Sequence, residues 1–322
     1  MADASLIRDR EDVRLTAAAA VASGECWQLP DGRAAVYQGQ NAASSGSRVS
    51  FTTTGQHTMT KTASMVFLAG GRAYWDHSAN AVTYKKVSDR DFYLGTFVDD
   101  AASADTTCNV NLNVDPRADI DLSRDGFLSV PTGTQAVGAF GFPKTIGGAQ
   151  LIELTATSEA QCIDLLSVDR FAIGANAIIE AIVRIPVNGS GSAVDFNIGI
   201  ANGTSTTDAD AITESVFFHI DGGALDILAE SDDGTTEVNA TDTTVDATAG
   251  SAVANRFEFW IDTRNPADIQ LYINGVNVLP SSVFTLGAAT GPMGLLAHLE
   301  KTTGTTTGQF VIDRFIARYS EQ

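Results

Sequence analysis

Apolar and polar residues alternate along much of this chain with the period of two that sends neighbouring side chains to opposite faces of a β-strand. The clearest case is Arg256–Asp262, in which Phe257, Phe259 and Ile261 fall on one face. The alternation resumes over residues 269–273 after a short polar turn. The front third of the chain has many short strand-like stretches and no credible amphipathic helix. The pattern therefore predicts an all-β protein.

Local turn chemistry indicates two hairpins. Asn274 and Gly275 form a strong type I′ turn signal between two short apolar stretches, and residues 30–32 (Pro-Asp-Gly) turn a pair of strands. Residues 202–210 and 241–251 are predicted to be polar loops. The other predicted strands cover residues 12–17, 48–54, 56–61, 72–76, 81–83, 94–98, 107–114, 151–156, 177–185, 194–201, 215–221, 225–230 and 310–318.

Residues 115–148 differ in composition from both flanks. They hold three Pro and six Gly residues, which interrupt regular structure, although residues 125–130 retain the character of a strand. We therefore predict three parts: a β-domain over residues 1–114, a linker over residues 115–148, and a second all-β domain over residues 149–322.

Charge is distributed unevenly between these parts. The 322 residues carry 20 Lys and Arg against 39 Asp and Glu, a net charge of −19. Residues 1–116 hold 10 basic and 13 acidic residues, a net of −3, which leaves −16 for the rest. Without a basic face to neutralise phosphates, nucleic acid is excluded as a partner. The difference fits a nearly neutral docking part and an acidic solvent-facing part, or simply two unrelated domains.

Cysteine usage and hydropathy indicate the compartment. Cys26, Cys108 and Cys162 are odd in number and widely spaced, which supports neither a disulfide framework nor a zinc site. We interpret them as buried thiols of a protein made in a reducing cytosol. The sequence shows no secretory signal, and no apolar run reaches the length of a membrane span.

Candidate catalytic groups are few. Glu258 and Asp262 share one face of a predicted strand, as the two carboxylates of a retaining glycosidase would, but we expect both to face solvent opposite the apolar face. The four histidines, His57, His77, His219 and His298, are scattered, without a recognisable nucleophile or metalloprotease motif. We expect structural imidazoles, no catalytic residues and no cofactor.

Two acidic turns raise the question of calcium, whose ligands are oxygens. They are Asp208 with Asp210, and residues 232–234 (Asp-Asp-Gly). Neither matches a known calcium loop, so we interpret both as solvated turns and expect no metal ligands. Trp260 has the opposite phase to its apolar neighbours; a buried position is favoured over a sugar-stacking one.

A hairpin near the centre of the front domain carries two large aromatic residues. Two glycines precede Tyr74, Trp75 and Asp76, a polar turn follows, and residues 81–83 resume extended structure. Tyr74 and Trp75 fall on opposite faces. The hairpin is interpreted either as core or as an interface with a partner.

The sequence of this hairpin is Gly-x-x-x-Tyr-Trp-Asp, followed by a short polar turn and a Val-Thr strand. It resembles that of a phage cement, or head-decoration, family. The resemblance includes residues 13–25, residues 94–98 and residues 101–113 (Ala-Ala-Ser-Ala-Asp-Thr-Thr-Cys-Asn-Val-Asn-Leu-Asn), in the family's order, with Ala in the first stretch where the family often has Pro. It covers about the first third of the chain. The many short, closely spaced strands of this part indicate a small β-barrel or sandwich.

The back of the chain resembles the concanavalin-like (laminin-G-like) jelly-roll sandwich. Residues 259–262 (Phe-Trp-Ile-Asp) and 271–275 (Leu-Tyr-Ile-Asn-Gly) are similar to its strand, loop and hairpin, and residues 310–318 to its returning terminal strand. Lectins, glycosidases and adhesion modules share this fold, so it says little about function by itself.

Together the resemblances imply a non-enzymatic bacteriophage decoration protein, a structural protein on the outer surface of the virion. Its partners would be the major capsid protein and itself, as a homotrimer. Bridging neighbouring subunits would stabilise the head. The alternative is a carbohydrate-binding adhesin that recognises host-surface glycans through the back domain; a glycoside hydrolase is the third.

Overall fold

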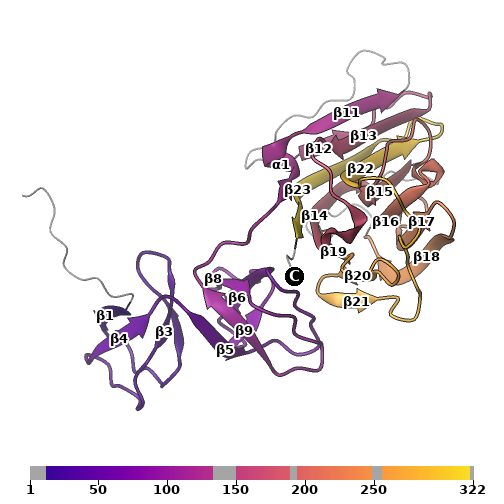
Figure 1. Cartoon of the computed structure of the whole chain (residues 1–322). Helices are drawn as coiled ribbons and strands as arrows, with labels where there is room; N and C mark the ends of the chain where they lie inside the picture. The colour runs from indigo at the N-terminus through magenta and orange to yellow at the C-terminus, as the bar shows by residue number, and fades with distance from the viewer. Residues whose placement is uncertain (1–11, 133–149, 189–193, 249–255, 320–322) are drawn as a thin grey trace, which may run out of the picture. The chain divides into compact units, whose positions relative to one another are not determined.

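The computed structural model describes residues 12–132, 150–188, 194–248 and 256–319, and Figure 1 shows the whole chain. The chain divides into two compact units, Met1–Arg117 and Ala118–Gln322, called unit 1 and unit 2. Within the described residues, every pair of strands is antiparallel, and helix is confined to α1 (Leu122–Asp125) and two 3-10 turns. The predicted all-β fold class is confirmed.

Unit 1 contains two small sheets, each made of short strands. Their strands, in spatial order, are β1 (Asp12–Thr16), β4 (Arg48–Thr52), β3 (Ala34–Tyr37) and β2 (Cys26–Gln28) in the first sheet, and β5 (Gln56–Thr60), β9 (Thr107–Leu112), β8 (Phe92–Phe97), β6 (Arg72–Asp76) and β7 (Ala81–Thr83) in the second. Aromatic rings pack against each sheet. At the first sheet Phe51 contacts both Trp27 and Tyr37. At the second sheet Phe67 stacks on Phe97, with 4.3 Å between the ring centroids. Sheets this small depend on such aromatic burial.

The aromatic hairpin predicted from the sequence is β6 and β7. Asp76 pairs with Ala81 across it, and the Asp76 carboxylate accepts hydrogen bonds from the backbone N–H groups of Ser78 and Ala79, which forms the tight turn. Tyr74 and Trp75 are both half-buried. The hairpin therefore contributes to the second sheet while leaving part of each ring accessible.

One side chain connects the two sheets of unit 1. Asn113 follows β9 in a left-handed conformation with φ of 56°. Its amide oxygen accepts from the Ala34 N–H at 2.9 Å, and its amide nitrogen donates to the Ala34 and Thr53 carbonyls at 2.9 and 2.7 Å. Three hydrogen bonds thus tie the end of one sheet to the first sheet.

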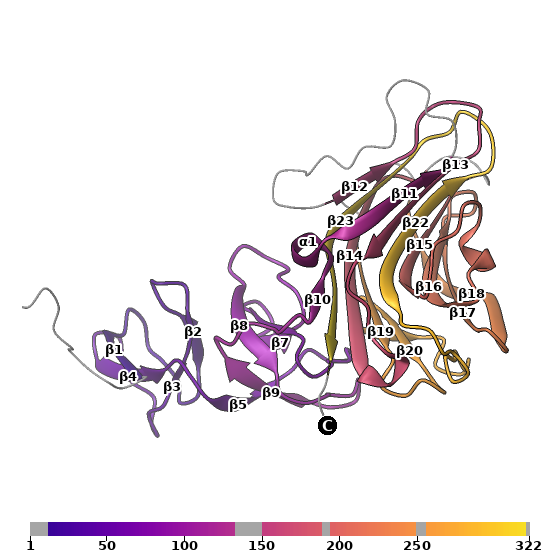
Figure 2. The same cartoon turned by 45° about the horizontal axis from the view of Figure 1, so that its top comes forward.

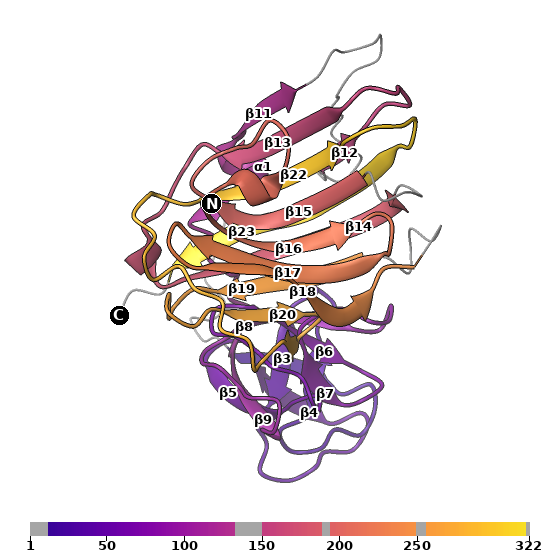
Figure 3. The same cartoon turned by 90° about the vertical axis from the view of Figure 1, so that its right-hand side faces the viewer.

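Unit 2 is a sandwich of two seven-stranded sheets, which lie face to face (Figure 2). One sheet, called sheet T, has the strand order β10 (Ile120–Asp121), β23 (Gly308–Tyr319), β14 (Ala177–Asn188), β19 (Arg256–Asp262), β20 (Gln270–Ile273) and β21 (Val276–Val278). Strand β12 (Gln150–Glu153) is also paired to β23. The second sheet, called sheet S, runs β11 (Phe127–Thr132), β13 (Gln161–Ser167), β22 (Gly294–Lys301), β15 (Val194–Ala201), β16 (Glu214–Asp221), β17 (Asp226–Asp233) and β18 (Glu237–Asp246). Figure 3 shows sheet S face on.

Apolar residues from both sheets meet in one core. The ring of Phe218 in sheet S stacks on that of Phe259 in sheet T, with 4.6 Å between the ring centroids. Phe196 of sheet S stacks on Phe310 of sheet T at 4.0 Å. The Asn274 and Gly275 turn between β20 and β21 has φ values of 53° and 79°, both positive as a type I′ turn requires. This hairpin matches its prediction from the sequence.

The described strands differ from the predicted ones at several places. Part of the expected linker over residues 115–148 is structured, because β10 pairs with β23 and β11 pairs with β13; residues 133–149 lie outside the described residues. β13 and β22 were not predicted, since charged residues interrupt their apolar positions. Residues 241–246 of β18 were expected to belong to a polar loop, because their sequence is rich in Thr and Asp.

Asn113→Gly tests the tie between the sheets of unit 1. Glycine accepts the left-handed backbone, so the substitution removes chiefly three hydrogen bonds, each with a net contribution of about 0.5–1.5 kcal/mol. We expect amide hydrogen exchange in β3 and β9 to report a loss of about 1.5–4 kcal/mol in opening free energy. Asn80→Gly is the matched control, because Asn80 has a φ of 51° in an exposed turn. Equal losses in both variants would contradict the tie.

Candidate functional site

The outer face of sheet S, turned away from the core, carries a row of polar side chains. Asp164 pairs with His298, His298 with Asn197, and Asn197 with His219 across four adjacent strands. Each residue lies between two core-facing apolar neighbours on its own strand. Strand alternation therefore forces all four side chains onto the same outer face.

His298 is the centre of a closed hydrogen-bonded network. Its Nδ1 lies 2.8 Å from Oδ1 of Asp164 and its Nε2 lies 3.1 Å from Oε2 of Glu300. The Cys162 thiol lies 3.3 Å from the Ser205 carbonyl and 3.7 Å from the His298 Nδ1. The side chains of His298 and Asp164 are fully buried, so this network is packed rather than open to a substrate.

Opposing effects set the protonation of this network. Burial alone would lower the pKa of His298, but hydrogen bonds with Asp164, Cys162 and Glu300 outweigh it and hold that pKa well above 6.5. Burial raises the pKa of the Cys162 thiol, against the effect of the neighbouring imidazole. The imidazole is therefore a buried cation compensated by carboxylates, which is the condition for burying charge.

His219, one position along the same row, has looser surroundings. Its Nε2 lies 3.7 Å from Oδ1 of Asp195, and its Nδ1 lies 3.6 Å from Oε2 of Glu230, both beyond ordinary hydrogen-bond length. Among the residues that the structure describes, neither ring nitrogen nor Oε1 of Glu230 has a hydrogen-bond partner. Asp210 joins the group from the 3-10 turn η2 (Ala209–Ala211).

The carboxylates around His219 perturb each other. Asp210 is exposed as a residue, but partial shielding of its carboxylate from solvent raises its pKa to about 7, and the Glu230 and Asp208 charges act in the same direction. Burial alone would lower the pKa of His219. The carboxylates of Asp195 and Glu230 outweigh that effect and raise the pKa to about 10. The group therefore concentrates negative charge that only one imidazole offsets.

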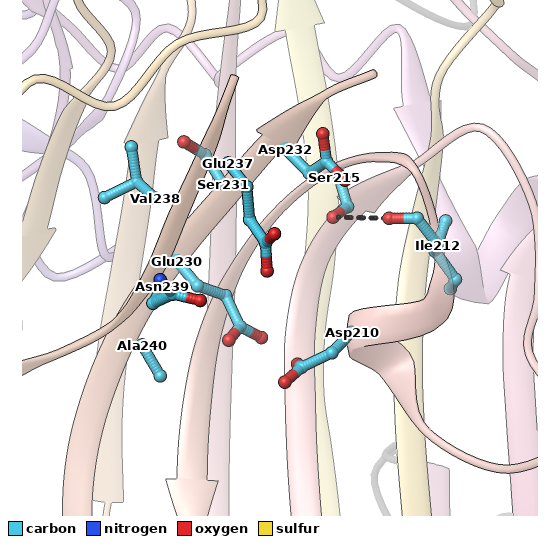
Figure 4. A pocket seen from close by; sticks show the side chains of 10 residues that line it. All are labelled: Asp210, Ile212, Ser215, Glu230, Ser231, Asp232, Glu237, Val238, Asn239 and Ala240. Atoms are coloured by element: carbon cyan, nitrogen blue, oxygen red, sulfur yellow. Dashed lines mark hydrogen bonds between the residues drawn. The ribbon is translucent and has the colours of Figure 1, made fainter. Parts of the chain in front are cut away.

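A surface pocket opens beside this group (Figure 4). The Asp210 and Glu230 carboxylates point toward one another across it, and Ser215 Oγ donates to the Ile212 carbonyl at 3.3 Å on its wall. Strand β18 closes the other side with Glu237. The pocket gives the His219 group a route to solvent that the His298 network lacks.

Two sets of described residues place three metal-binding atoms within 4.8 Å of one another. They are Cys162, Asp164 and His298, and Asp210, His219 and Glu230. In the first set His298 and Asp164 are hydrogen-bonded at 2.8 Å, whereas in the second the two ring nitrogens of His219 have no hydrogen-bond partner among the described residues. No histidine motif signalled this in the sequence, because Asp164 and His298 are 134 residues apart. The only local signal was the polar alternation of His298 and Glu300 within β22.

The carboxylate pair considered from the sequence, Glu258 and Asp262, is not solvent-facing, so that expectation was wrong. Both residues are 8% exposed. Trp260, buried as favoured, donates from Nε1 to Oε1 of Glu258 at 3.0 Å, and Arg264 Nε donates to Oδ1 of Asp262 at 2.8 Å. Burial and the Glu180 charge raise the pKa of Glu258 to about 7.

The acidic turns use their carboxylates for local hydrogen bonds. Asp208 accepts from the Asp210 N–H at 3.0 Å, and Asp232 accepts from the Gly234 N–H at 2.7 Å. The buried Asp233 accepts from three backbone N–H groups, including that of Ala288 at 3.1 Å. These contacts explain the turns as structural features. The Asp210 carboxylate differs in that it faces the Glu230 carboxylate across the pocket.

Comparison with known proteins connects unit 1 to a family. The family described as "Phage cement protein" matches residues 7–112, which confirms the resemblance of the front third of the chain. Residues 7–112 are therefore similar to phage cement proteins, and the match does not extend to the rest of the chain. No curated protein matches the chain. No described helix is long and apolar enough to cross a membrane.

Several solved structures match part of the chain at low similarity. One comes from work on endo-acting O-glycanases of the human gut microbiota, with 11% identity over 64% of this chain and 100% of that chain, at a TM-score of 0.43. LamAcat from Zobellia galactanivorans has 14% identity over 54% and 78%, at 0.39. The Emp46p carbohydrate recognition domain has 12% over 53% and 84%, at 0.33. Because these TM-scores are low, the fold of unit 2 is described from its own sheets and strand registers.

We expect the stability of unit 2 to decrease as pH rises above 6.5. The folded pKa of His298 lies above its unfolded value of 6.5, so its contribution is fully present below pH 6.5 and is lost as pH rises through the folded pKa. Two-dimensional NMR should show the His298 ring still protonated at pH 8. A neutral ring at that pH would contradict the charged network.

A double substitution separates charge compensation from packing. His298→Gln leaves two carboxylates buried without their cation and should cost about 3–5 kcal/mol in the free energy of unfolding. Asp164→Asn with His298→Gln removes one of those charges and should recover part of the loss. Urea unfolding followed by the circular dichroism of unit 2 measures both; a double variant that is no better than His298→Gln would contradict compensation.

Proposed function

We propose that this chain is a decoration (cement) protein of a bacteriophage capsid, and that unit 1 is the part that binds the head. The observation that carries the proposal is the extent of the family match. Residues 7–112 coincide closely with the compact unit Met1–Arg117 and include the nine strands described in that unit. The match therefore covers a whole compact module, and a module with its own core can carry a binding function by itself.

Decoration is a binding function that needs no chemistry. A protein that binds the assembled lattice and not the separate subunits stabilises the lattice by mass action. If three copies associate, each additional contact with the head becomes intramolecular and adds avidity. We propose that the partner is the major capsid protein, that the site of binding is the outer surface of the virion, and that the bound form is a homotrimer without enzymatic activity.

The β6–β7 hairpin is the proposed capsid contact. Tyr74 and Trp75 are half-buried, and Trp75 pairs across strands with Val82 and Phe92. Aromatic rings with one wet edge are enriched at protein interfaces, because they bury a large area at low entropic cost. Asp76 holds the turn and would set the direction in which the rings are presented.

Heads stripped of this protein should release their DNA at a lower temperature than heads to which it has been restored. Packaged DNA pushes outward, and contacts of standard size that bridge subunits bury about 1,200–2,000 Å², so the bound state should also survive moderate salt. A dye that fluoresces on released DNA, followed during heating, gives the measurement. Equal release temperatures with and without the protein would refute the cement role, and a glycan array would then test the adhesin alternative.

A fragment of residues 1–117 should compete with the full chain for stripped heads, whereas residues 118–322 should not. The reason is that the family match ends inside unit 1. Sedimentation of heads with labelled full chain, at increasing fragment concentration, measures the competition. Circular dichroism of each fragment establishes that it is folded. Competition by the back fragment alone would assign head binding to unit 2.

A further inference from the structure

We propose that Asp210, His219 and Glu230 bind one divalent transition-metal ion, for which zinc has the best-matched chemistry. The three residues come from η2, β16 and β17, and their ligand atoms lie within 4.8 Å of one another. Imidazole nitrogen and carboxylate oxygen are both zinc ligands, and a site with three protein ligands leaves the fourth position to water. The proposal concerns unit 2 and is independent of head binding.

The distances within the group suit a metal better than a hydrogen bond. The Nδ1 of His219 and Oε2 of Glu230 are 3.6 Å apart. Zinc bonds of about 2.0–2.1 Å in tetrahedral geometry place neighbouring ligand atoms about 3.3–3.4 Å apart. A hydrogen bond between the same atoms would require at most about 3.2 Å. The His219–Glu230 spacing therefore needs only a small contraction around an ion, and Asp210 lies within 4.8 Å of both atoms.

Asp195 supplies the contact that a metal-binding imidazole requires on its other nitrogen. Its Oδ1 lies 3.7 Å from Nε2 of His219, on the side away from Glu230. In the ion-bound state we assign the Nε2 proton to face Asp195, while the ion displaces the Nδ1 proton and binds the Nδ1 lone pair on the side of Glu230 and Asp210. A carboxylate behind the ring is the usual partner of a metal-binding histidine, where it fixes the ring orientation.

Glu230 is the independent observation that points to a ligand. Its residue is 7% exposed, and within the described part of the chain its Oε1 has no hydrogen-bond partner. An orphaned buried carboxylate oxygen is costly, so it indicates a missing partner. Figure 4 shows this carboxylate directed into the pocket toward Asp210. Asp210 is exposed, so an ion can enter from solvent and bind both.

The class of metal follows from the donors. An imidazole favours zinc and neighbouring transition metals over calcium and magnesium, which prefer oxygen ligands throughout. The nearby set of Cys162, Asp164 and His298 contains a thiol. However, the ring nitrogens of His298 already lie 2.8 Å from Asp164 and 3.1 Å from Glu300. An ion there would have to displace those bonds. Binding at His219 would instead fix η2 to sheet S.

Calorimetric titration of the chelator-treated full chain with zinc chloride tests the proposal. We expect binding at one ion per chain, with a rise in the melting temperature of unit 2. Asp210→Asn and Glu230→Gln should each weaken binding by more than about 10-fold, and Asp195→Asn by about 10–100-fold, as loss of a supporting carboxylate does. Asp246→Asn, an exposed Asp on the adjacent strand β18, removes the same charge and should bind zinc like the parent.

Cobalt provides a readout that depends on the ligands themselves. Tetrahedral cobalt bound at this group should give strong visible absorption, which Asp210→Asn abolishes in a protein that remains folded because that side chain is exposed. The proposal is overturned if the chain binds no stoichiometric zinc. It is also overturned if Asp210→Asn, Glu230→Gln and Asp246→Asn bind zinc equally well, since the charge of the surface alone would then account for binding.

Discussion

Packing of the two seven-stranded sheets of unit 2 against each other determines where its other side chains lie. Phe218 on Phe259 and Phe196 on Phe310 join the inner faces, and apolar residues at every second position complete the core. A slip of one residue in any of these strands would exchange its buried and outer faces. The same constraint that buries Leu299 therefore places His298 and Glu300 on the outer face of sheet S.

Two histidines in one cross-strand row show how strongly distance decides the role of a side chain. His298 lies 2.8 and 3.1 Å from its carboxylates, whereas His219 lies 3.7 and 3.6 Å from its own. The first arrangement satisfies each charge and contributes to one packed state. The second leaves buried polar atoms without hydrogen bonds among the described residues, a cost that a native protein bears when another ligand offsets it.

The sequence predicts best those elements whose information is local. The β19 alternation and the Asn274 and Gly275 turn lie within a few residues of each other, so the β19–β21 region matched its prediction. β13 and β22 were missed because buried polar residues break their pattern, and their meaning appears only when Asp164 meets His298 across 134 residues. Glu258 was placed in solvent for the same reason, since nothing local reveals what covers the second face of its strand.

The division of charge gives the two units different physical properties under the proposed function. Residues 1–116 carry a net charge of only −3, so their docking requires little work against an acidic surface, and burial of aromatic and backbone groups can decide affinity. The remaining residues carry −16, which favours solubility and mutual repulsion between decorated particles. Such a charge also concentrates cations near unit 2 and lowers the cost of binding one where carboxylates converge. Asp210, Glu230 and Asp195 converge on His219 in this way, so the electrostatics that keep the unit in solution also favour an ion at this group.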